Sequence, residues 1–142
     1  MARCCAGIRI GCKRRVPPAS LHSPTFFVSF ASSASFMSTT QFDGVTVQTQ
    51  ANVYFEGKCI SHSLRLADGS KKSVGVILPA TLTFNTGAAE VMECVAGACD
   101  YLLAGSSAWQ HCAAGESFAV PAHSSFQIRV SDQPYHYICH FA

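Results

Sequence analysis

A chain of 142 residues usually folds around one hydrophobic core, and 49% hydrophobic against 13% charged residues is typical of a compact domain. All eight acidic residues lie at or after Asp43, so the part from Gln41 onward, with five basic and eight acidic side chains, has a formal charge of −3. A negatively charged domain does not attract the phosphate backbone of nucleic acid, so we exclude nucleic acid as a partner. The sparse charge favours self-association, and we expect a homodimer.

Residues 1–40 differ from the rest of the chain. They contain no acid, five basic residues, a Pro-Pro pair at 17–18 and seven serines, which is the composition of an organelle transit peptide. Alternatively, translation starts at Met37 and the upstream residues are a disordered tail or a gene-model artefact. The stretch Phe26–Phe36 is too short and too rich in serine to span a bilayer, so we expect no membrane partner.

The eight cysteines show neither paired CxxC units nor the spacing of a zinc site, so we predict no disulfide framework and no structural metal. Free thiols among apolar residues indicate a reducing compartment. We expect a cytoplasmic protein, or an organellar (mitochondrial) one if residues 1–36 are a genuine transit peptide. The cysteines are at positions 4, 5, 12, 59, 94, 99, 112 and 139.

From Val45 onward, apolar residues alternate with polar ones in short runs, which predicts β-strands. Turn residues separate the runs at Ala67–Ser70, Pro79–Ala80, Asn85–Gly87, Ala104–Ser107 and Ala113–Gly115. The C-terminal third continues the alternation through Phe126, Ile128 and Val130 to Tyr135–Phe141. We predict an all-β domain over residues 42–142, with eight or nine short strands in a sandwich or jelly roll.

Two segments resemble the motifs of the cupin family. Gly115–Phe126 resembles the second motif, with Phe126 where cupins carry a metal-binding histidine and His123 where they carry a glycine. The segment containing Thr83, Asn85, Glu90 and Gly97 resembles the first motif, with Thr83 and Asn85 in place of two histidines. This resemblance implies a cupin-type jelly-roll (double-stranded β-helix) barrel that binds no metal.

Six runs in order over residues 52–141 resemble the pyrimidine/purine nucleoside phosphorylase family, which is built on a metal-free cupin. The resemblance implies a homodimeric enzyme that splits purine and pyrimidine nucleosides with phosphate, giving free base and ribose 1-phosphate, with no cofactor. The runs are Asn52–Lys58, Lys72–Pro79, Thr83–Thr86, Glu90–Met92, Val120–Phe126 and Tyr137–Cys139.

Glu90 and His123 are the predicted catalytic residues. A carboxylate inside an apolar barrel can accept hydrogen bonds from ribose hydroxyls and stabilise an oxocarbenium-like centre, and burial would raise its pKa. His123, on the turn after Pro121, could bind phosphate or protonate the departing base. The alternatives are a glutamate that closes a loop and a structural histidine. We predict Glu93, of opposite strand parity, to be a surface charge.

The predicted substrate-binding residues are Thr83, Asn85, Thr86, Phe126 and Lys72. Residues 83 and 85 share one face of a strand, which we expect to face the barrel interior, although both could instead close the turn at Thr86. Phe126 could stack on any base, or be an ordinary core residue. Lys72, with Lys71, could supply a cation for phosphate, or be a solvated turn lysine.

Other conspicuous side chains are assigned to packing: the ladder Tyr135, Tyr137, Cys139, Phe141, and Trp109. Two further functions stay open from the sequence. A metal-dependent cupin enzyme would need three converging imidazole or carboxylate ligands, which are not apparent here. A cupin that binds a small molecule without catalysis has no sequence feature against it, since function depends on sites rather than folds.

Overall fold

The structure is a computed structural model that describes residues 40–142. The prediction of a targeting-like or disordered extension at residues 1–40, with Met37 as a possible start, concerns residues that lie almost entirely outside this range. No helix in the described part is long and apolar enough to cross a membrane.

Eleven strands and one short 3-10 helix make up the described residues. In chain order they are β1 (Thr46–Val47), β2 (Asn52–Tyr54), η1 (Phe55–Gly57), β3 (Cys59–Arg65), β4 (Lys71–Ile77), β5 (Ala80–Asn85), β6 (Glu90–Ala96), β7 (Ala98–Leu103), β8 (Gln110–Ala113), β9 (Ser117–Val120), β10 (Ser125–Val130) and β11 (Tyr135–Phe141). The all-β prediction is confirmed.

The alternation of apolar and polar residues explains why these segments form strands with one buried face. In β10, Phe126, Ile128 and Val130 are buried while Gln127 and Arg129 are exposed, because successive side chains point to opposite faces of a strand. Each buried apolar side chain of this size contributes roughly 1.5–3 kcal/mol through removal from water.

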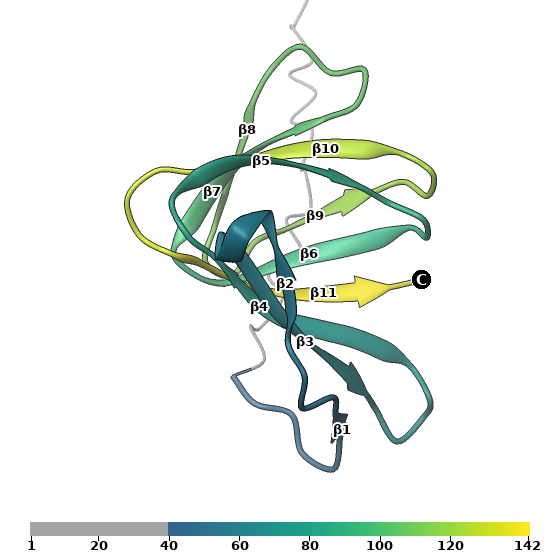
Figure 1. Cartoon of the computed structure of the whole chain (residues 1–142). Helices are drawn as coiled ribbons and strands as arrows, with labels where there is room; N and C mark the ends of the chain where they lie inside the picture. The colour runs from purple at the N-terminus through teal and green to yellow at the C-terminus, as the bar shows by residue number, and fades with distance from the viewer. Residues whose placement is uncertain (1–39) are drawn as a thin grey trace, which may run out of the picture. The chain divides into compact units, whose positions relative to one another are not determined.

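The strands form two antiparallel sheets that face each other (Figure 1). The large sheet has the order β1-β3-β4-β11-β6-β9, with β2 also paired to β3, and the small sheet has the order β5-β10-β7-β8. The last strand, β11, lies between β4 and β6, far from both in sequence. Such non-local pairing is what a jelly roll requires.

The core lies between the sheets. We call the side of the large sheet that faces the small sheet its inner face and the other side its outer face. Ile77, Met92 and Tyr135 from the inner face pack with Phe126 and Ile128 of the small sheet. The five cysteines of the described region are free and buried.

Gly97 and Gly75 permit close approach of neighbouring strands. At Gly97, where φ is +78°, a Cβ would collide with the carbonyl of Pro134. At Gly75 a Cβ would lie 2.7 Å from the hydroxyl oxygen of Tyr137 and 2.7 Å from the carbonyl oxygen of Ile60. Gly75 therefore leaves room for the Tyr137 ring on the inner face.

Candidate active site

A cavity of about 270 Å³ opens between the sheets at the end where β5 turns into β6. It is lined by both sheets: Tyr54, Ser61, Ser73, Ile77, Phe84, Asn85, Thr86, Gly87, Ala88, Glu90, Met92, Phe126, Tyr137, Cys139 and Phe141. This is close to the small end of the usual size range for ligand pockets, and its lining is mostly apolar with a few polar groups, as ligand pockets usually are. We call it the Glu90 cavity.

Glu90 is the only acidic side chain among the residues that line this cavity. It begins β6, directly opposite Phe141 on β11 and Val120 on β9. Its Oε2 lies 3.6 Å from Sγ of Cys139, which donates a hydrogen bond to it. Burial raises the pKa of Glu90, and the Cys139 contact opposes this rise. The prediction that Glu90 lies inside the barrel is confirmed.

Aromatic rings form the opposite wall. Phe84 and Phe126 are opposite each other on β5 and β10, with parallel rings whose centroids are 5.4 Å apart. Phe55 from η1 approaches Phe84 edge-on at 5.0 Å, and Phe118 approaches Phe126 edge-on at 5.8 Å. Phe126 is only 3% exposed, whereas Phe84 is only partly buried. Phe84 is therefore the more accessible surface for an aromatic ligand.

The predicted orientation of Thr83 is wrong. Leu82 and Phe84 are the β5 residues that face the interior, so Thr83 lies on the exposed side of the strand, opposite Gln127. The resemblance to the first cupin motif suggested that Thr83 faces the interior, because cupins carry metal ligands at the positions of Thr83 and Asn85. Asn85, at the end of β5, is exposed but still lines the rim of the cavity.

Thr86 lines the cavity, but its hydroxyl is used to fix a loop. Oγ1 donates to the carbonyl of Pro121 at 2.6 Å and accepts from the amide of Ser124 at 3.0 Å. These bonds hold the β9–β10 loop against the rim. The substrate-binding role of Thr86 stays a prediction. His123 lies on that loop, exposed and with φ +52°, and is not among the residues that line the cavity. Its role as a proton donor stays a prediction.

Glu93 is not the surface charge that the sequence predicted. Its side chain lies on the outer face of the large sheet, where the residue is 3% exposed and lies between Ile138 of β11 and Ser117 of β9. Its Oε2 is 2.8 Å from Nε2 of His140, and Nδ1 of His140 is 2.6 Å from Nζ of Lys72. A lysine ammonium can only donate, so Nδ1 of His140 accepts and Nε2–H donates to Glu93.

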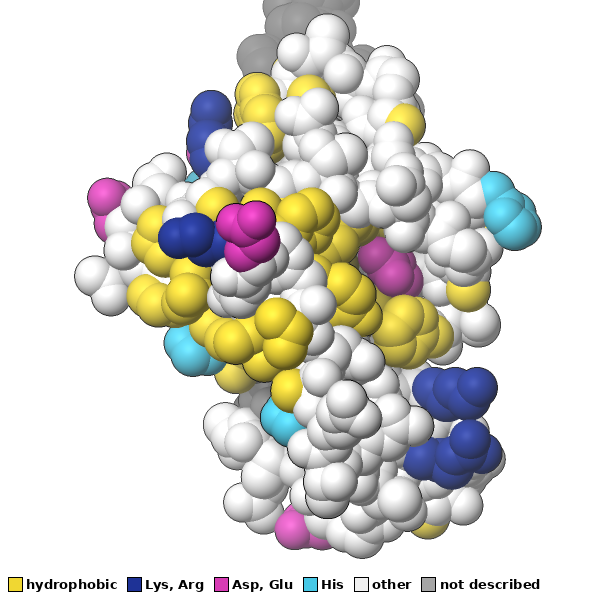
Figure 2. Space-filling view, in the orientation of Figure 1, with side chains coloured by type: hydrophobic (Ala, Val, Ile, Leu, Met, Phe, Trp, Pro, Cys, Tyr) yellow, Lys and Arg dark blue, Asp and Glu magenta, His cyan; other side chains and the backbone are white. Residues whose placement is uncertain are grey.

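A second cavity, of about 550 Å³, adjoins the Glu90 cavity and shares Ala88 and Phe141 with it. Lys72 lines this second cavity, but its ammonium is already bonded to His140. Two further cations, Arg65 and Lys71, line it as well. Figure 2 shows basic side chains gathered near the end of the β3–β4 hairpin. We call it the cationic cavity.

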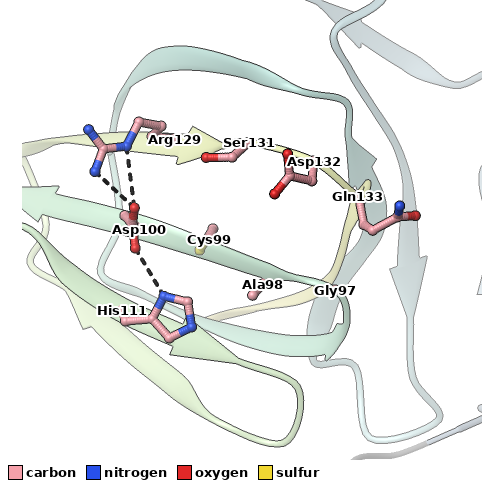
Figure 3. Close-up of a pocket in the computed structure, with 9 residues that line it drawn as sticks. All are labelled: Gly97, Ala98, Cys99, Asp100, His111, Arg129, Ser131, Asp132 and Gln133. Carbon is pink, nitrogen blue, oxygen red and sulfur yellow. Dashed lines mark hydrogen bonds and ion pairs between the residues drawn. The ribbon is translucent and has the colours of Figure 1, made fainter.

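A third cavity, of about 350 Å³, lies on the small sheet near the turn after β10 (Figure 3). Asp100 accepts hydrogen bonds from His111 at 3.0 Å and from Arg129 at 2.9 Å, which lower the pKa of Asp100, and the bond to Asp100 raises the pKa of His111. Arg129 also lies 4.5 Å above the ring of Trp109, in line with the packing role predicted for Trp109. The side chains of Asp100, His111 and Arg129 thus use one another as hydrogen-bond partners, which is typical of a cluster with a structural role.

Several cavity residues were missed by the sequence reasoning. Tyr137, Cys139 and Phe141 were assigned to packing, and Phe84, Ser61 and Ser73 were not proposed as site residues. Phe84 could have been found from strand parity, because it alternates with the buried Leu82. The serines could not, because their position depends on how β3 pairs with β4. Among residues 40–142, no three His, Cys, Asp or Glu side chains converge so as to hold a metal ion.

Comparisons with solved structures place the fold. A protein of unknown function from Acinetobacter sp. ADP1 superposes with a TM-score of 0.70 at 46% identity, over 72% of this chain and 98% of the other. The cupin oxalate decarboxylase of Bacillus subtilis superposes with a TM-score of 0.56 at 12% identity, over 68% of this chain and 28% of the other. The second likeness shows the cupin fold alone, and confirms that prediction.

Comparisons with sequences are more specific. The family profile for pyrimidine/purine nucleoside phosphorylase matches residues 49–141. A pyrimidine/purine nucleoside phosphorylase of Polaromonas naphthalenivorans (strain CJ2) is 68% identical over 108 residues, covering 75% of this chain and all of that protein. Another, of Thiobacillus denitrificans, is 67% identical over 102 residues, covering 72% and 98%. The chain belongs to the pyrimidine/purine nucleoside phosphorylase family.

Proposed function

We propose that this chain catalyses the phosphorolysis of purine and pyrimidine nucleosides to free base and α-D-ribose 1-phosphate, with broad specificity for the base. The observation that carries the proposal is the single half-buried carboxylate, Glu90, facing an aromatic wall in a cavity of ligand size. The names of the similar proteins agree with this class of reaction.

Glu90 is proposed to hold the ribose. In phosphorolysis, a phosphate oxygen forms a bond to the anomeric carbon while the C–N bond to the base breaks and its electron pair leaves with the base, which then takes up a proton. The sugar passes through an oxocarbenium-like state. A carboxylate fixed at the start of β6 can accept ribose hydroxyls and stabilise that positive charge. His123 stays our proposal for the group that supplies the proton.

Phe84 is proposed to stack on the base. A ring surface binds the face of any base, and the rings of this wall are all phenylalanines, which carry no polar group that could recognise a base edge. Such a wall supports the broad specificity in the proposal.

The proposal is tested by incubating the full-length protein with uridine and with inosine, with and without inorganic phosphate. We expect release of uracil and hypoxanthine together with ribose 1-phosphate, and only when phosphate is present. If base is released equally without phosphate, the protein is a hydrolase. If no nucleoside is consumed, a cupin that binds a small molecule without catalysis replaces our proposal.

A further inference from the structure

We propose that the cationic cavity is the site where inorganic phosphate binds, with Arg65 and Lys71 as its principal ligands. This inference rests on the proposed function for the identity of the anion. The site itself is argued from charge, strand register and hydrogen bonding.

Positive charge is concentrated around the cationic cavity. The part of the chain from Gln41 onward has five basic side chains and a formal charge of −3, yet three of the five, Arg65, Lys71 and Lys72, line this one cavity. Of the remaining two, Arg129 is paired with Asp100. Most of the basic side chains of this negatively charged part of the chain therefore line the cationic cavity, which favours the binding of an anionic ligand there.

The register of β3 and β4 places two of these cations side by side. Arg65 and Lys71 are directly opposite each other on β3 and β4, at the last pair before the hairpin turn. Like charges in such a pair destabilise a sheet. Within residues 40–142, neither side chain has an acidic partner, and the nearest acid along the hairpin, Asp68, is bonded to the amide and hydroxyl of Ser70. A bound dianion would remove this repulsion.

Lys72 differs from the other two cations in its hydrogen bonding. Its ammonium donates to His140, which in turn donates to the buried Glu93, so its charge is offset within the protein. Arg65 and Lys71 have no such link in the described residues. The planar guanidinium of Arg65 also provides the paired donors that suit a phosphate.

A hydroxyl on the same face completes the set of donors. Ser63 lines the cationic cavity, and its Oγ accepts a hydrogen bond from Nδ2 of Asn52 at 3.2 Å. The hydroxyl proton of Ser63 is thereby left to donate toward the cavity. Because the cationic and Glu90 cavities share Ala88 and Phe141, a phosphate in one lies beside a ribose in the other.

The test measures phosphate binding by calorimetry, without nucleoside, for the full-length protein and for Arg65→Gln and Lys71→Gln. Lys58→Gln, which changes an exposed lysine that does not line either cavity, is the control. We expect the dissociation constant for phosphate to rise at least about tenfold in both variants and to stay unchanged in the control. We also expect their melting temperatures to stay the same or rise, because each variant relieves a like-charge pair.

Steady-state kinetics then separate this inference from the proposed function. If the enzyme is a phosphorylase, the KM for phosphate should rise in both variants while the KM for the nucleoside changes little. If phosphorolysis is observed but neither variant changes the KM or binding of phosphate, the phosphate site lies elsewhere and only this inference fails. If phosphate binding depends on Arg65 and Lys71 but no nucleoside is cleaved, the anion site stands and the proposed function fails.

Discussion

The two faces of the large sheet carry two glutamates, three residues apart on β6, in opposite situations. On the inner face, the one hydrogen bond that Glu90 accepts from a side chain of residues 40–142 is a weak one from a thiol, and Glu90 lines an accessible cavity. On the outer face, Glu93 is nearly inaccessible and is linked through His140 to Lys72. A carboxylate kept without a strong partner next to a cavity is available to a ligand, whereas one bonded into a chain of side chains holds the sheet together.

Replacing Glu90 should have the largest effect. We expect Glu90→Gln to fold normally and to lower turnover by about 10²-fold or more, roughly 3 kcal/mol, because glutamine keeps the shape but not the charge that opposes the oxocarbenium-like centre. The measurement is turnover of uridine with phosphate, alongside thermal unfolding. Asp43→Asn, which neutralises an exposed acid outside both cavities, is the control. Lowered thermal stability with full activity per molecule would give Glu90 a structural role instead.

Because the pKa of Glu90 is raised, the activity of the wild-type protein should depend on pH in a way that the activity of Glu90→Gln does not. If the anionic form is the active one, kcat/KM should fall as the pH drops through a pKa above the usual glutamate value of about 4.3. A pH–rate profile of the wild-type protein measures this, and we expect the acidic limb to be absent from the residual activity of Glu90→Gln. An acidic limb retained unchanged in that variant would assign the titration to another group.

Removing the aromatic wall should have the next largest effect. We expect Phe84→Ala to raise the KM for uridine and inosine about tenfold, since stacking of a base on an aromatic side chain contributes roughly 1–3 kcal/mol. Trp109→Ala, which removes a ring on the small sheet outside the Glu90 cavity, should leave both KM values unchanged. Steady-state kinetics with the two nucleosides decide this, and equal effects of the two variants would argue against stacking on Phe84.

On the outer face, a change should affect stability rather than turnover. We expect Glu93→Gln to lower the free energy of unfolding by about 1–3 kcal/mol, because it weakens a buried hydrogen bond and leaves Lys72 without its counter-charge. Chemical denaturation measures the loss, again with Asp43→Asn as control. Unchanged stability together with a large loss of turnover would transfer the functional role from Glu90 to Glu93.

The smallest effect is expected in the Asp100 cluster of the small sheet. The lowered pKa of Asp100 means that its stabilisation is present above the unfolded pKa and is lost as the pH falls through the folded one. The raised pKa of His111 means that its stabilisation is lost as the pH rises. Asp100→Asn should therefore lower the melting temperature by only a few degrees, most clearly between about pH 4 and 6.5. A deficit that persists unchanged at pH 3 would contradict this electrostatic explanation.

Strand periodicity was enough to predict the fold class, because residues such as Phe126, Ile128 and Val130 alternate with polar ones. The position of Glu90 on the inner face came instead from the resemblance to the cupin motif. Periodicity failed where the answer depends on pairing between distant strands. The neighbours of Glu93 in the sheet, Ile138 and Ser117, follow from the pairing of β6 with β11 and β9. The opposed cations Arg65 and Lys71 follow from the register of β3 and β4.

Thr83 shows a different kind of failure. Its orientation was inferred from a motif whose metal ligands are missing from this chain, while the neighbouring Leu82 and Phe84 already marked the buried side of β5. Where a motif has lost the residues that define it, the apolar alternation of the strand itself is the safer guide to which face is buried.

The central claim, that chemistry takes place at the inner face between Glu90 and the aromatic wall, is tested most directly by two crystal structures of Glu90→Gln, one with uridine alone and one with phosphate alone. Because phosphorolysis needs both substrates, the nucleoside stays intact in the first. We predict density for uracil against Phe84, the ribose hydroxyls at residue 90 and phosphate next to Arg65 and Lys71. Nucleoside density at the outer face beside Glu93, or in the cavity lined by Asp100, would contradict the claim.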